Sequence, residues 1–306
     1  MNVLVTGGAG FIGSHLVDAY LAQGHDVAVI DNLSSGRREN VNPAARFYQV
    51  DIGDPAVDKI LGRERPELVN HHAAQIEVRT SIAEPEKDIQ HNIVGLVRLV
   101  TACIEHKTRM FVFASTGGAI YGEPDRSPVP ESAPVRPLSP YGVDKVAGEL
   151  YLKYYEATHG LQVRILRYAN VYGPRQNAKA EAGVIAIFLK AMLSGQRPRI
   201  FGDGTQQRDF VYVGDVVRAG LAAPNAPNSD PINIGTGEMT SVNALYQALC
   251  EATGFDQPPL YESARAGDVH SISLDPTLAG KRLGWKPETD LCVGVRQTAE
   301  YFKSEL

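Results

Sequence analysis

The chain has 306 residues, of which 43% are hydrophobic and 21% charged, as is ordinary for a globular protein with one large domain or two modest ones. A net charge of -5, a sequence pI near 5.9 and scattered arginines argue against nucleic-acid binding. Neither a signal peptide nor an apolar run of membrane-spanning length is seen, and the three cysteines are far apart, so we expect a soluble, cytoplasmic protein without a disulfide framework.

Short β-branched segments alternate through the first half of the chain with segments whose apolar residues recur at helical spacing. This alternation is typical of βαβ units. It predicts a Rossmann-type doubly wound parallel sheet, an α/β fold with helices on both faces. The expected strands are residues 2–7, 26–31, 46–52, 68–74, 110–116 and 162–173.

A glycine-rich turn follows the first predicted strand, where Gly7, Gly10 and Gly13 fill a G-x-x-G-x-x-G spacing before a helix. Glycine lets the backbone approach a pyrophosphate, and the N–H groups at a helix start attract the anion. Asp31 ends the second strand, where a carboxylate accepts from both ribose hydroxyls and repels a 2′-phosphate. The sequence therefore predicts a dinucleotide site that favours NAD over NADP.

The next two strand ends should line the same crevice, because ligands of open parallel sheets bind at the carboxyl ends of the strands. Asp51 and Ile52 end the third strand, and residues 71–75 end the fourth. His71 and His72 are adjacent in a strand and should point to opposite faces. None of the eight histidines shows metal-ligand spacing with a second one, so no metal is predicted.

The segment 88–106 predicts a helix with more apolar surface than one sheet-facing stripe requires. Its apolar positions are Ile89, Ile93, Leu96, Val97, Val100 and Ile104. A helix buried on more than one side needs a further partner, and a second copy of the chain would supply it.

A hydroxyl, a phenol and an ammonium group are predicted to converge beyond this helix. The strand 110–116 ends in Ser115 and Thr116, and Tyr141 precedes Lys145 by four residues at the start of a long helix. That spacing puts both side chains on one helical face. A phenol with a reference pKa near 10 is a poor base, but Lys145 and a positive nicotinamide ring favour the phenolate. Tyr141 is therefore a candidate general base.

After residue 172 the pattern changes to loops, a helix over 184–195 ended by Gly195, and a turn-rich strand pair within 197–215. We expect a smaller, partly interleaved second domain. The predicted NAD-binding domain is 1–170 plus about 208–236, and the predicted second domain is 171–207 and 237–306.

Motifs along nearly the whole chain resemble the extended short-chain dehydrogenase/reductase family, and within it the UDP-glucose 4-epimerases and related nucleotide-sugar epimerases. The matching segments are TGGAGFIGSHL, DNLSSG, HHAAQIEVRTS, Asn92, STGGAIYG, SPYGVDK, LRYANVYGPRQ, RDFVYVGDV, NIGTG and RAGD, between residues 6 and 268. The resemblance implies a tightly held NAD and a sugar that is oxidised at C4 to a 4-keto intermediate, turns over and takes the hydride back on its other face.

The resemblance also implies a catalytic triad of Tyr141, Lys145 and Thr116. Because STGGAIYG is one residue longer than the common form, Ser115 remains an alternative for the hydroxyl, with Thr116 favoured by its place nearer the glycines. Asp144, where many relatives have serine, should face away from the pocket, because it does not share a helical face with both Tyr141 and Lys145.

The cofactor contacts implied by these motifs lie at the glycine turn and at successive strand ends. They are Gly7, Gly10, Phe11, Ile12, Gly13, Asp31, Asn32, Ser35, Gly36, Asp51, Ile52, His72, Ala73, Ala74, Gln75, Asn92, Ser115, Tyr141, Lys145 and Tyr168.

The implied substrate is a UDP-sugar. Its contacts are Thr116, Tyr141, Asn170, Val184, Phe201, Arg208, Arg265 and Asp268. Arg208 and Arg265 occupy diphosphate-binding positions, which suits the bidentate preference of guanidinium for phosphate, and Asp268 matches the ribose-binding position. The resemblance further implies a homodimer in which helices near 88–106 and 141–159 form a four-helix bundle.

Several alternatives stay open at this point. Ile272 falls by counting at the position that admits or excludes N-acetylated sugars, with Ser271 or Ser273 there if the register shifts by one, so UDP-N-acetylhexosamine and UDP-uronate 4-epimerases remain candidates. A dehydratase would carry Asp-Glu after Thr116, where this chain has Gly117 and Gly118. A decarboxylase of the same family and a non-catalytic NAD-sensing module are further rivals, the latter expected to lack the tyrosine or the lysine.

Overall fold

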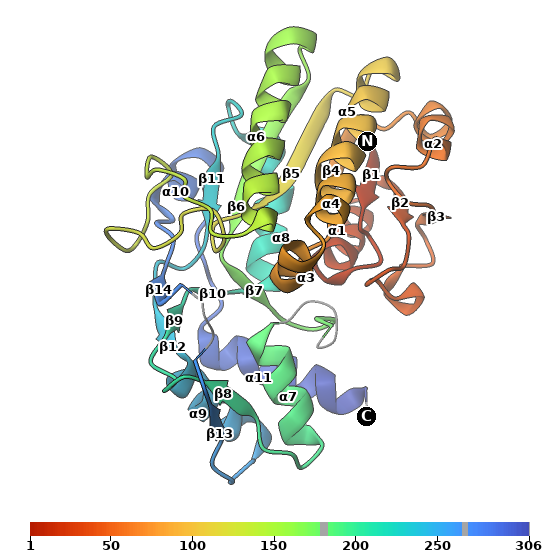
Figure 1. Ribbon diagram of the computed structural model, residues 1–306. Helices are drawn as coiled ribbons and strands as arrows, with labels where there is room; N and C mark the ends of the chain where they lie inside the picture. Colours follow the sequence, from red (N-terminus) through yellow and green to blue (C-terminus); the bar gives the residue numbers. More distant parts are fainter. Residues whose placement is uncertain (178–182, 265–268, 306) are drawn as a thin grey trace.

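A seven-stranded parallel sheet forms the centre of the larger part of the molecule (Figure 1). The structure is a computed structural model that describes residues 1–177, 183–264 and 269–305. The strand order is β3-β2-β1-β4-β5-β6-β11, which confirms the predicted doubly wound sheet. The strands are β1 (Asn2–Thr6), β2 (Asp26–Asp31), β3 (Arg46–Gln49), β4 (Leu68–His71), β5 (Met110–Thr116), β6 (Gln162–Tyr168) and β11 (Ile232–Ile234). The order reverses between β1 and β4, so a crevice opens at their carboxyl ends.

Helices cover both faces of this sheet. One face carries α1 (Phe11–Ala22), α8 (Val213–Ala222) and α10 (Thr277–Leu283), whereas the other carries α2 (Ala56–Glu64), α5 (Gly95–Glu105) and α6 (Pro140–His159). Between β4 and α5 the chain forms α3 (Val78–Ala83), α4 (Pro85–Ile89) and a π-helical turn, η2 (Gln90–Val94). Short 3₁₀ turns lie at η1 (Arg38–Asn40) and η3 (Ala223–Asn225).

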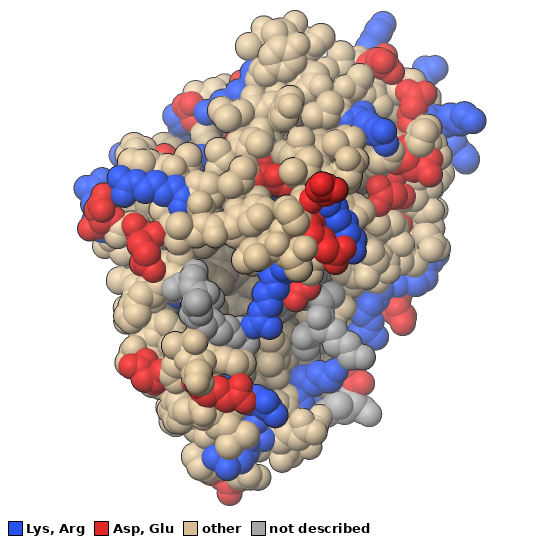
Figure 2. Space-filling view, viewed as in Figure 1, with Lys and Arg blue, Asp and Glu red and all other residues tan. Residues whose placement is uncertain are grey.

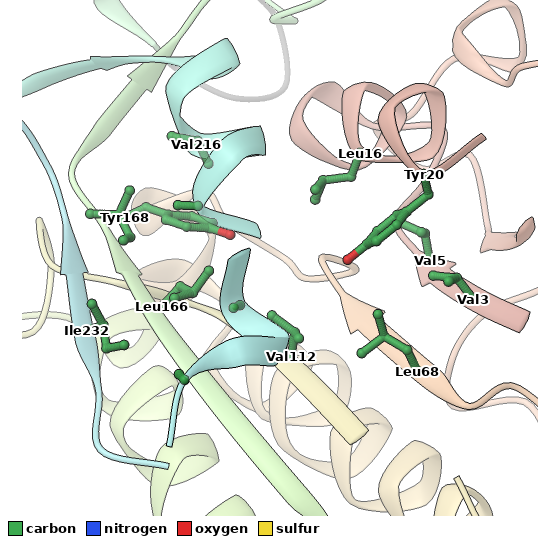
Figure 3. Packing of buried hydrophobic residues seen from close by; sticks show 14 of the residues in the cluster. Val3, Val5, Leu16, Tyr20, Leu68, Val112, Leu166, Tyr168, Val216 and Ile232 are labelled. Atoms are coloured by element: carbon green, nitrogen blue, oxygen red, sulfur yellow. The ribbon is translucent and has the colours of Figure 1, made fainter. Parts of the chain in front are cut away.

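The side chains of each strand divide between two hydrophobic clusters, because successive strand residues point to opposite faces. Val3 and Val5 pack under α1 and α8, whereas Leu4 packs against the opposite layer. Figure 3 shows the first cluster, in which Leu16 and Tyr20 of α1 and Val216 of α8 lie over strand residues such as Val112 and Leu166. A fully buried aliphatic side chain of this kind contributes about 1.5–3 kcal/mol.

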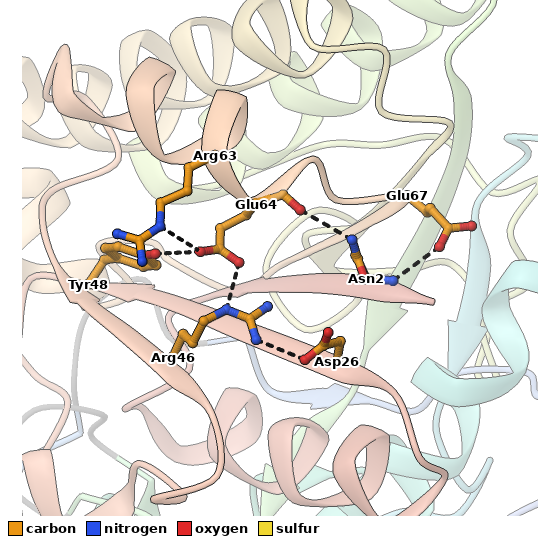
Figure 4. A network of polar contacts seen from close by, with 7 residues as sticks. All are labelled: Asn2, Asp26, Arg46, Tyr48, Arg63, Glu64 and Glu67. Carbon is orange, nitrogen blue, oxygen red and sulfur yellow. Dashed lines mark hydrogen bonds and ion pairs between the residues drawn. The ribbon is translucent and has the colours of Figure 1, made fainter.

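A polar network ties the amino ends of β1, β2 and β3 to α2 (Figure 4). Glu64 is buried at the end of α2, where its carboxylate accepts from Arg46 Nε at 2.7 Å and from the Tyr48 hydroxyl. Arg46 also donates to Asp26 at 2.8 Å, and the Asn2 amide donates to the Glu64 carbonyl at 3.3 Å. The network fixes the end of the sheet opposite the crevice.

The smaller part of the molecule has its own hydrophobic cluster, which is built by α7 (Val184–Leu193), α9 (Val242–Thr253) and α11 (Leu291–Ser304). Figure 1 shows this part below the main sheet. Helix α7 confirms the predicted helix and ends just before Gly195, whose φ of +70° suits glycine.

Two sequence predictions about strands are wrong in detail. The segment 162–173 forms two strands, β6 and β7 (Asn170–Tyr172), and β7 leaves the main sheet to pair with β10 (Phe210–Tyr212). The segment 197–215 is no strand pair, because its strands pair elsewhere. β8 (Arg199–Phe201) pairs with β13 (Leu260–Glu262), and β9 (Gln207–Arg208) pairs with both β12 (Thr240–Ser241) and β14 (Ser271–Ile272).

The chain passes several times between the two parts. After β10 it returns to the main sheet as α8 and β11, and after β14 it returns again as α10, whose Ala279 joins the cluster under α1 together with Trp285. The segment around 277–285 thus packs on the main sheet, although it lies in the range predicted for the second domain. Among the helices formed by the described residues, none has the length and apolar character needed to span a bilayer.

Candidate functional site

A cavity of about 730 Å³ lies between the carboxyl ends of the main strands and the smaller part of the molecule. Its volume is within the range of small-molecule binding sites. Figure 2 shows the surface hollowed between the two parts, with Lys and Arg side chains beside the hollow. Residues from the glycine turn, from the segment that follows β4, from β5, β6 and α6, and from α7 and β8 all line this cavity.

The glycine turn brings bare backbone to the cavity wall. Gly7 has a φ of +70°, and a Cβ there would lie 2.7 Å from the Ala73 nitrogen. A Cβ on Gly13 would lie 2.2 Å from the Gly7 carbonyl oxygen, so the start of α1 can pack against the turn only without a side chain. Gly10 is the N-cap of α1 and offers no side chain to cap it. Gly7, Gly10, Phe11, Ile12 and Gly13 line the cavity, which suits an anion at the helix start.

Asp31 lies at the end of β2 as predicted and lines the cavity. Its carboxylate accepts from the Ala9 N–H at 3.0 Å and from the Leu33 N–H at 2.8 Å. Burial raises the pKa of Asp31, and these two N–H groups lower it. Nearby, Asn32 donates to Asp51 at 2.7 Å, so the ends of β2 and β3 are joined. Ser35 and Ile52 line the same region.

His72, at the end of β4, is stacked on Tyr168 with ring centroids 5.9 Å apart, and its Nε2 lies 3.3 Å from the Tyr168 hydroxyl. Burial lowers the pKa of His72 to about 3, so this imidazole is neutral. His71 instead contacts Thr6 Oγ1 through Nδ1 at 2.7 Å. The described residues contain no group of three or more His, Cys, Asp or Glu side chains placed to hold a metal ion.

Two predicted cofactor contacts lie behind the cavity wall rather than in it. Asn92 accepts from the Gln75 N–H at 2.9 Å and donates to the Gln75 carbonyl at 2.9 Å, so it fixes the loop whose Ala73, Ala74 and Gln75 line the cavity. Gly36 lies against Asp31, where a Cβ would be 3.0 Å from the carboxylate oxygen. The sequence could not separate these supporting roles from direct contact.

Tyr141, Lys145 and Thr116 come together on the cavity wall. Helix α6 begins at Pro140, because Pro suits the first helical position and the Ser139 hydroxyl accepts from the Gly142 N–H at 3.2 Å. Lys145 Nζ lies 5.8 Å from the centroid of the Tyr141 ring and donates to the Ala114 carbonyl at 2.9 Å. Thr116 lies near enough to the Tyr141 phenol for a hydrogen bond between them to lower the pKa of the phenol.

The surroundings of Tyr141 and Lys145 raise and lower the pKa values of the two groups by opposing effects. Burial raises the pKa of the Tyr141 phenol, the charge on Asp88 raises it further, and the hydrogen bond with Thr116 lowers it. Burial lowers the pKa of Lys145 to about 8, and this fall is limited by the negative charges of Asp88, Glu149 and Asp144. A lysine with that pKa remains largely an ammonium at neutral pH.

Ser115 also lines the cavity, but its hydroxyl is committed elsewhere. It donates to Glu149 Oε1 at 2.6 Å, and Glu149 is held by two hydrogen bonds from Arg167, at 2.9 and 2.6 Å. Arg167 in turn donates to the Tyr121 hydroxyl at 2.8 Å. This geometry favours Thr116 over Ser115 as the hydroxyl beside Tyr141.

The predicted sugar-nucleotide residues Asn170, Val184, Phe201 and Arg208 line the far side of the cavity. Arg208 donates to the carbonyls of Gln207 and His270, at 2.8 and 3.2 Å. Arg265 and Asp268 lie outside the described residues.

Ile272 does not line the cavity as the sequence count suggested. It is buried in a cluster with Ile120, Tyr121, Val129 and Leu274. Of its neighbours, Ser271 contacts Gln207 and Ser273 is fully buried, and neither lines the cavity.

Residues that the sequence did not single out complete the cavity, among them Glu77, Lys87, Gln176, Arg199 and Gln206. Gln176 and Gln206 lie in or beside motifs that the sequence does show, so a signal for them existed. Gln206 donates to the Phe201 carbonyl at 2.8 Å, which orients that strand. Glu77 lies within the motif HHAAQIEVRTS, so a signal existed for it too, whereas Lys87 of α4 belongs to no quoted motif and only the fold reveals it.

Comparisons with known proteins agree with this geometry. Residues 3–235 match the model of the NAD dependent epimerase/dehydratase family. A putative UDP-glucose 4-epimerase from Methanocaldococcus jannaschii is 47% identical, over 99% of this chain and 98% of the relative.

Two solved structures are similar over the whole chain. The crystal structure of UDP-glucose 4-epimerase from Thermotoga maritima with UDP-glucose has a TM-score of 0.98 and 48% identity, with 100% of this chain and 99% of that chain covered. The Thermus thermophilus UDP-glucose 4-epimerase in complex with NAD has a TM-score of 0.94 and 42% identity, with both chains fully covered.

Proposed function

Because the chain belongs to the NAD-dependent epimerase/dehydratase family, we propose that it is a UDP-glucose 4-epimerase, an isomerase that interconverts UDP-glucose and UDP-galactose through a 4-keto intermediate. One observation carries the proposal. The glycine turn, the Tyr141–Lys145 pair and Arg208 line the same cavity, so a dinucleotide and a nucleotide sugar would meet beside the phenol.

The site suits NAD as the resident cofactor. The backbone of the glycine turn and the start of α1 would hold its pyrophosphate, because a Cβ at Gly7 or Gly13 would strike backbone atoms. Asp31 would accept from the adenosine ribose, and Ser35, Asp51 and Ile52 would lie beside it. When bound, NAD supplies the hydride acceptor for sugar C4 and returns the hydride.

The side chains of this chain would move the proton. Tyr141 takes the proton from the sugar 4-hydroxyl and gives it back after the sugar has turned. Thr116 donates a hydrogen bond to the phenol, and the Lys145 ammonium favours the phenolate, as opposite charge does. The neutral His72 and Tyr168 fill the wall beside them without adding charge.

Residues on the far side of the cavity would hold the sugar nucleotide. Arg208 suits the diphosphate, Phe201 the uracil, and Asn170 and Val184 the sugar and diphosphate. On the resemblance alone we add Arg265 to the diphosphate site and Asp268 to the ribose site, both outside the described residues. We assign the NAD-binding part to 1–170 with about 208–236, and the sugar-nucleotide part to 171–207 and 237–306.

We also propose a cytoplasmic homodimer. Large apolar side chains are exposed on three neighbouring helices: Val78 and Ile82 of α3, Ile89 of α4, and Val143, Leu150, Tyr151 and Tyr154 of α6. Figure 2 shows mostly uncharged side chains over α6, with acidic and basic side chains beside them near α4. A contiguous apolar surface of this kind marks a contact, and pairing α6 and the α4–α5 segment with a second copy would make a four-helix bundle. Cys103, Cys250 and Cys292 are free thiols, in keeping with a reducing compartment.

Incubating the purified protein with UDP-galactose and no added NAD tests the activity. Formation of UDP-glucose is expected, because the cofactor is recycled in place. NAD binding without turnover of any sugar in a panel of UDP-hexoses, UDP-N-acetylhexosamines and UDP-uronates would contradict an epimerase and favour a sensing module. Turnover of only the N-acetylated or uronic acid sugars would reassign the substrate.

A further inference from the structure

Two buried carboxyl groups lie behind the cavity wall, one on α4 and one on α6. Asp88 is 1% exposed and Asp144 is 5% exposed, and neither lines the cavity. Each has a buried oxygen, Oδ2, without any hydrogen-bond donor in reach. The other oxygen of Asp88, Oδ1, accepts two hydrogen bonds, from Gln75 Nε2 at 2.7 Å and from Asn92 Nδ2 at 3.0 Å.

Helices α4 and α6 pack against each other, and the nearness of Asp88 to Asp144 is one cause of the raised pKa of Asp144, through its charge and a hydrogen bond between the two carboxyl groups. Such a contact needs a proton, because two carboxylates offer only acceptors. Two neighbouring carboxylates in a buried site repel each other, so the pair keeps one proton to a higher pH than an isolated carboxyl group does, and aspartyl pairs share that proton. A shared proton also supplies the donor that the unpaired oxygens lack, which removes the cost of leaving them buried and unsatisfied.

We propose that Asp88 and Asp144 share one proton and act as a positioning pair for the reaction, holding the Gln75 loop on one side and setting the charge beside Lys145 and Tyr141 on the other. The part of this proposal that concerns the shared proton and the Gln75 loop rests only on the contacts described above. Its effect on turnover rests on the proposed function.

The link to the cavity runs through short, named contacts. Asp88 orients the side chains of Gln75 and Asn92, and Asn92 clamps the Gln75 backbone at the cavity wall. Asp144 directly precedes Lys145 on α6. The pair therefore touches both the loop proposed to contact NAD and the helix that carries the proposed base.

Other ionisable groups surround the pair and share its field. Lys145 faces both carboxyl groups, and Tyr141 faces Asp88. Glu149, one turn along α6, acts on Lys145 but is held by Arg167 of β6. From β4, His71 and His72 face Lys145 and are kept neutral by burial, which lowers the pKa of both.

The charge of the pair changes with pH. Burial, then the charge and hydrogen bond of Asp88, raise the pKa of Asp144 to about 7, and Lys145 offsets part of this rise. Below that pH the pair carries one negative charge. Above it the pair carries two, and a second negative charge holds the proton on Lys145 to higher pH.

Asp144→Asn and Asp88→Asn are matched tests, because an amide keeps the shape and can donate to the remaining carboxylate as the shared proton does. Asp125→Asn is the control, since the Asp125 side chain is 84% exposed. At about pH 6 the infrared spectrum of the wild type should show the C=O stretch of a protonated carboxyl group. Asp125→Asn should keep this band, and either pair variant should lose it.

Thermal unfolding gives a second readout that does not depend on turnover. A folded pKa raised above the unfolded value stabilises at low pH, and this contribution is lost as pH rises through the folded pKa. The melting temperature of Asp144→Asn should therefore gain several degrees on the wild type between about pH 5 and pH 8. Parallel curves for wild type and both pair variants, with no variant-sensitive carboxyl band, would overturn the proposal.

The pH–rate profile tests the catalytic half. Wild type and Asp144→Asn both carry one negative charge at the pair below about pH 6, so their acid limbs should coincide. Above about pH 7 only the wild type gains the second charge, so the alkaline limb of Asp144→Asn should move to lower pH by about half a unit or more. A uniformly lowered profile of unchanged shape would reduce the pair to a structural role. Loss of all turnover in the wild type would contradict the proposed function while leaving the infrared and melting tests intact.

Discussion

The pKa of the Tyr141 phenol is raised by burial and by the charge of Asp88, and it is lowered by the hydrogen bond with Thr116. If it is the base, Tyr141→Phe should lower turnover by about 10²–10⁴-fold, the usual contribution of general acid–base catalysis. NAD should stay bound, because phenylalanine keeps the aromatic ring and the glycine turn that would hold the pyrophosphate is unchanged. Turnover and the cofactor content after gel filtration measure both effects. Near-normal turnover would refute the assignment of Tyr141.

Substitutions of Thr116 and Ser115 should have different effects, one on turnover and the other on the free energy of unfolding. Thr116→Val keeps the side-chain shape but removes the hydrogen bond to the phenol, so turnover should fall about 10- to 100-fold, as for a bond to a charged group of about 1.5–3 kcal/mol. Ser115→Ala removes a donor from the buried Glu149, so the free energy of unfolding should fall by about 1–3 kcal/mol. Denaturant titrations and steady-state rates separate the two. The opposite pattern would make Ser115 the catalytic hydroxyl.

At the residue scale, the sequence was sufficient where the chemistry is local. The glycine turn and Asp31 follow their strands directly, and Tyr141 and Lys145 are one helical turn apart, so their common location could be predicted. The contact of Asn92 with Gln75 could not be predicted, because the two residues lie on different segments. The sequence also predicted that Asp144 faces away from the pocket. It could not predict Asp88 as the neighbour of Asp144, because Asp88 is 56 residues earlier in the chain.

At the scale of elements, prediction succeeded for six of the seven strands of the main sheet, whereas the three-residue β11 and the short strands outside that sheet were not predicted with their partners. Apart from β3, which lies at the edge of the sheet, the predicted strands are largely buried on both faces and so are marked by apolar runs. β8, β9 and β10 have two or three residues each and pair with partners about 30 to 65 residues away in the sequence. Nothing local in their residues specifies such partners.

The Glu64 network predicts the effect of loosening one edge of the sheet. Glu64→Ala removes the carboxylate that joins Arg46 and Tyr48, so the free energy of unfolding should fall by about 1–3 kcal/mol. Arg46 is partly exposed and can return to water, which limits the loss. Turnover per folded molecule should not change, because the network lies at the opposite end of the strands from the cavity. Denaturation midpoints of Glu64→Ala and Glu64→Gln would show whether the carboxylate or only its packing matters.

At the scale of the whole molecule, the exposed apolar face on α3, α4 and α6 shows where a substitution should disrupt the proposed homodimer. Leu150 is 64% exposed, and Leu150→Glu would place a charge in the proposed contact between copies. The variant should elute as a monomer in gel filtration with light scattering. Val293→Glu is the matched control, because Val293 is also exposed, at 45%, but lies on α11. A dimeric Leu150→Glu, or a monomeric wild type, would contradict this interface.

The repeated passage of the chain between the two parts limits how the molecule can move. A body joined by a single linker opens like a hinge, whereas here β7, β10, β11 and α10 tether both halves at separate places. No single cut in the gene would release either half as an independent folding unit. Ligand exchange is accordingly expected through shifts of individual loops at the rim, on a rigid frame.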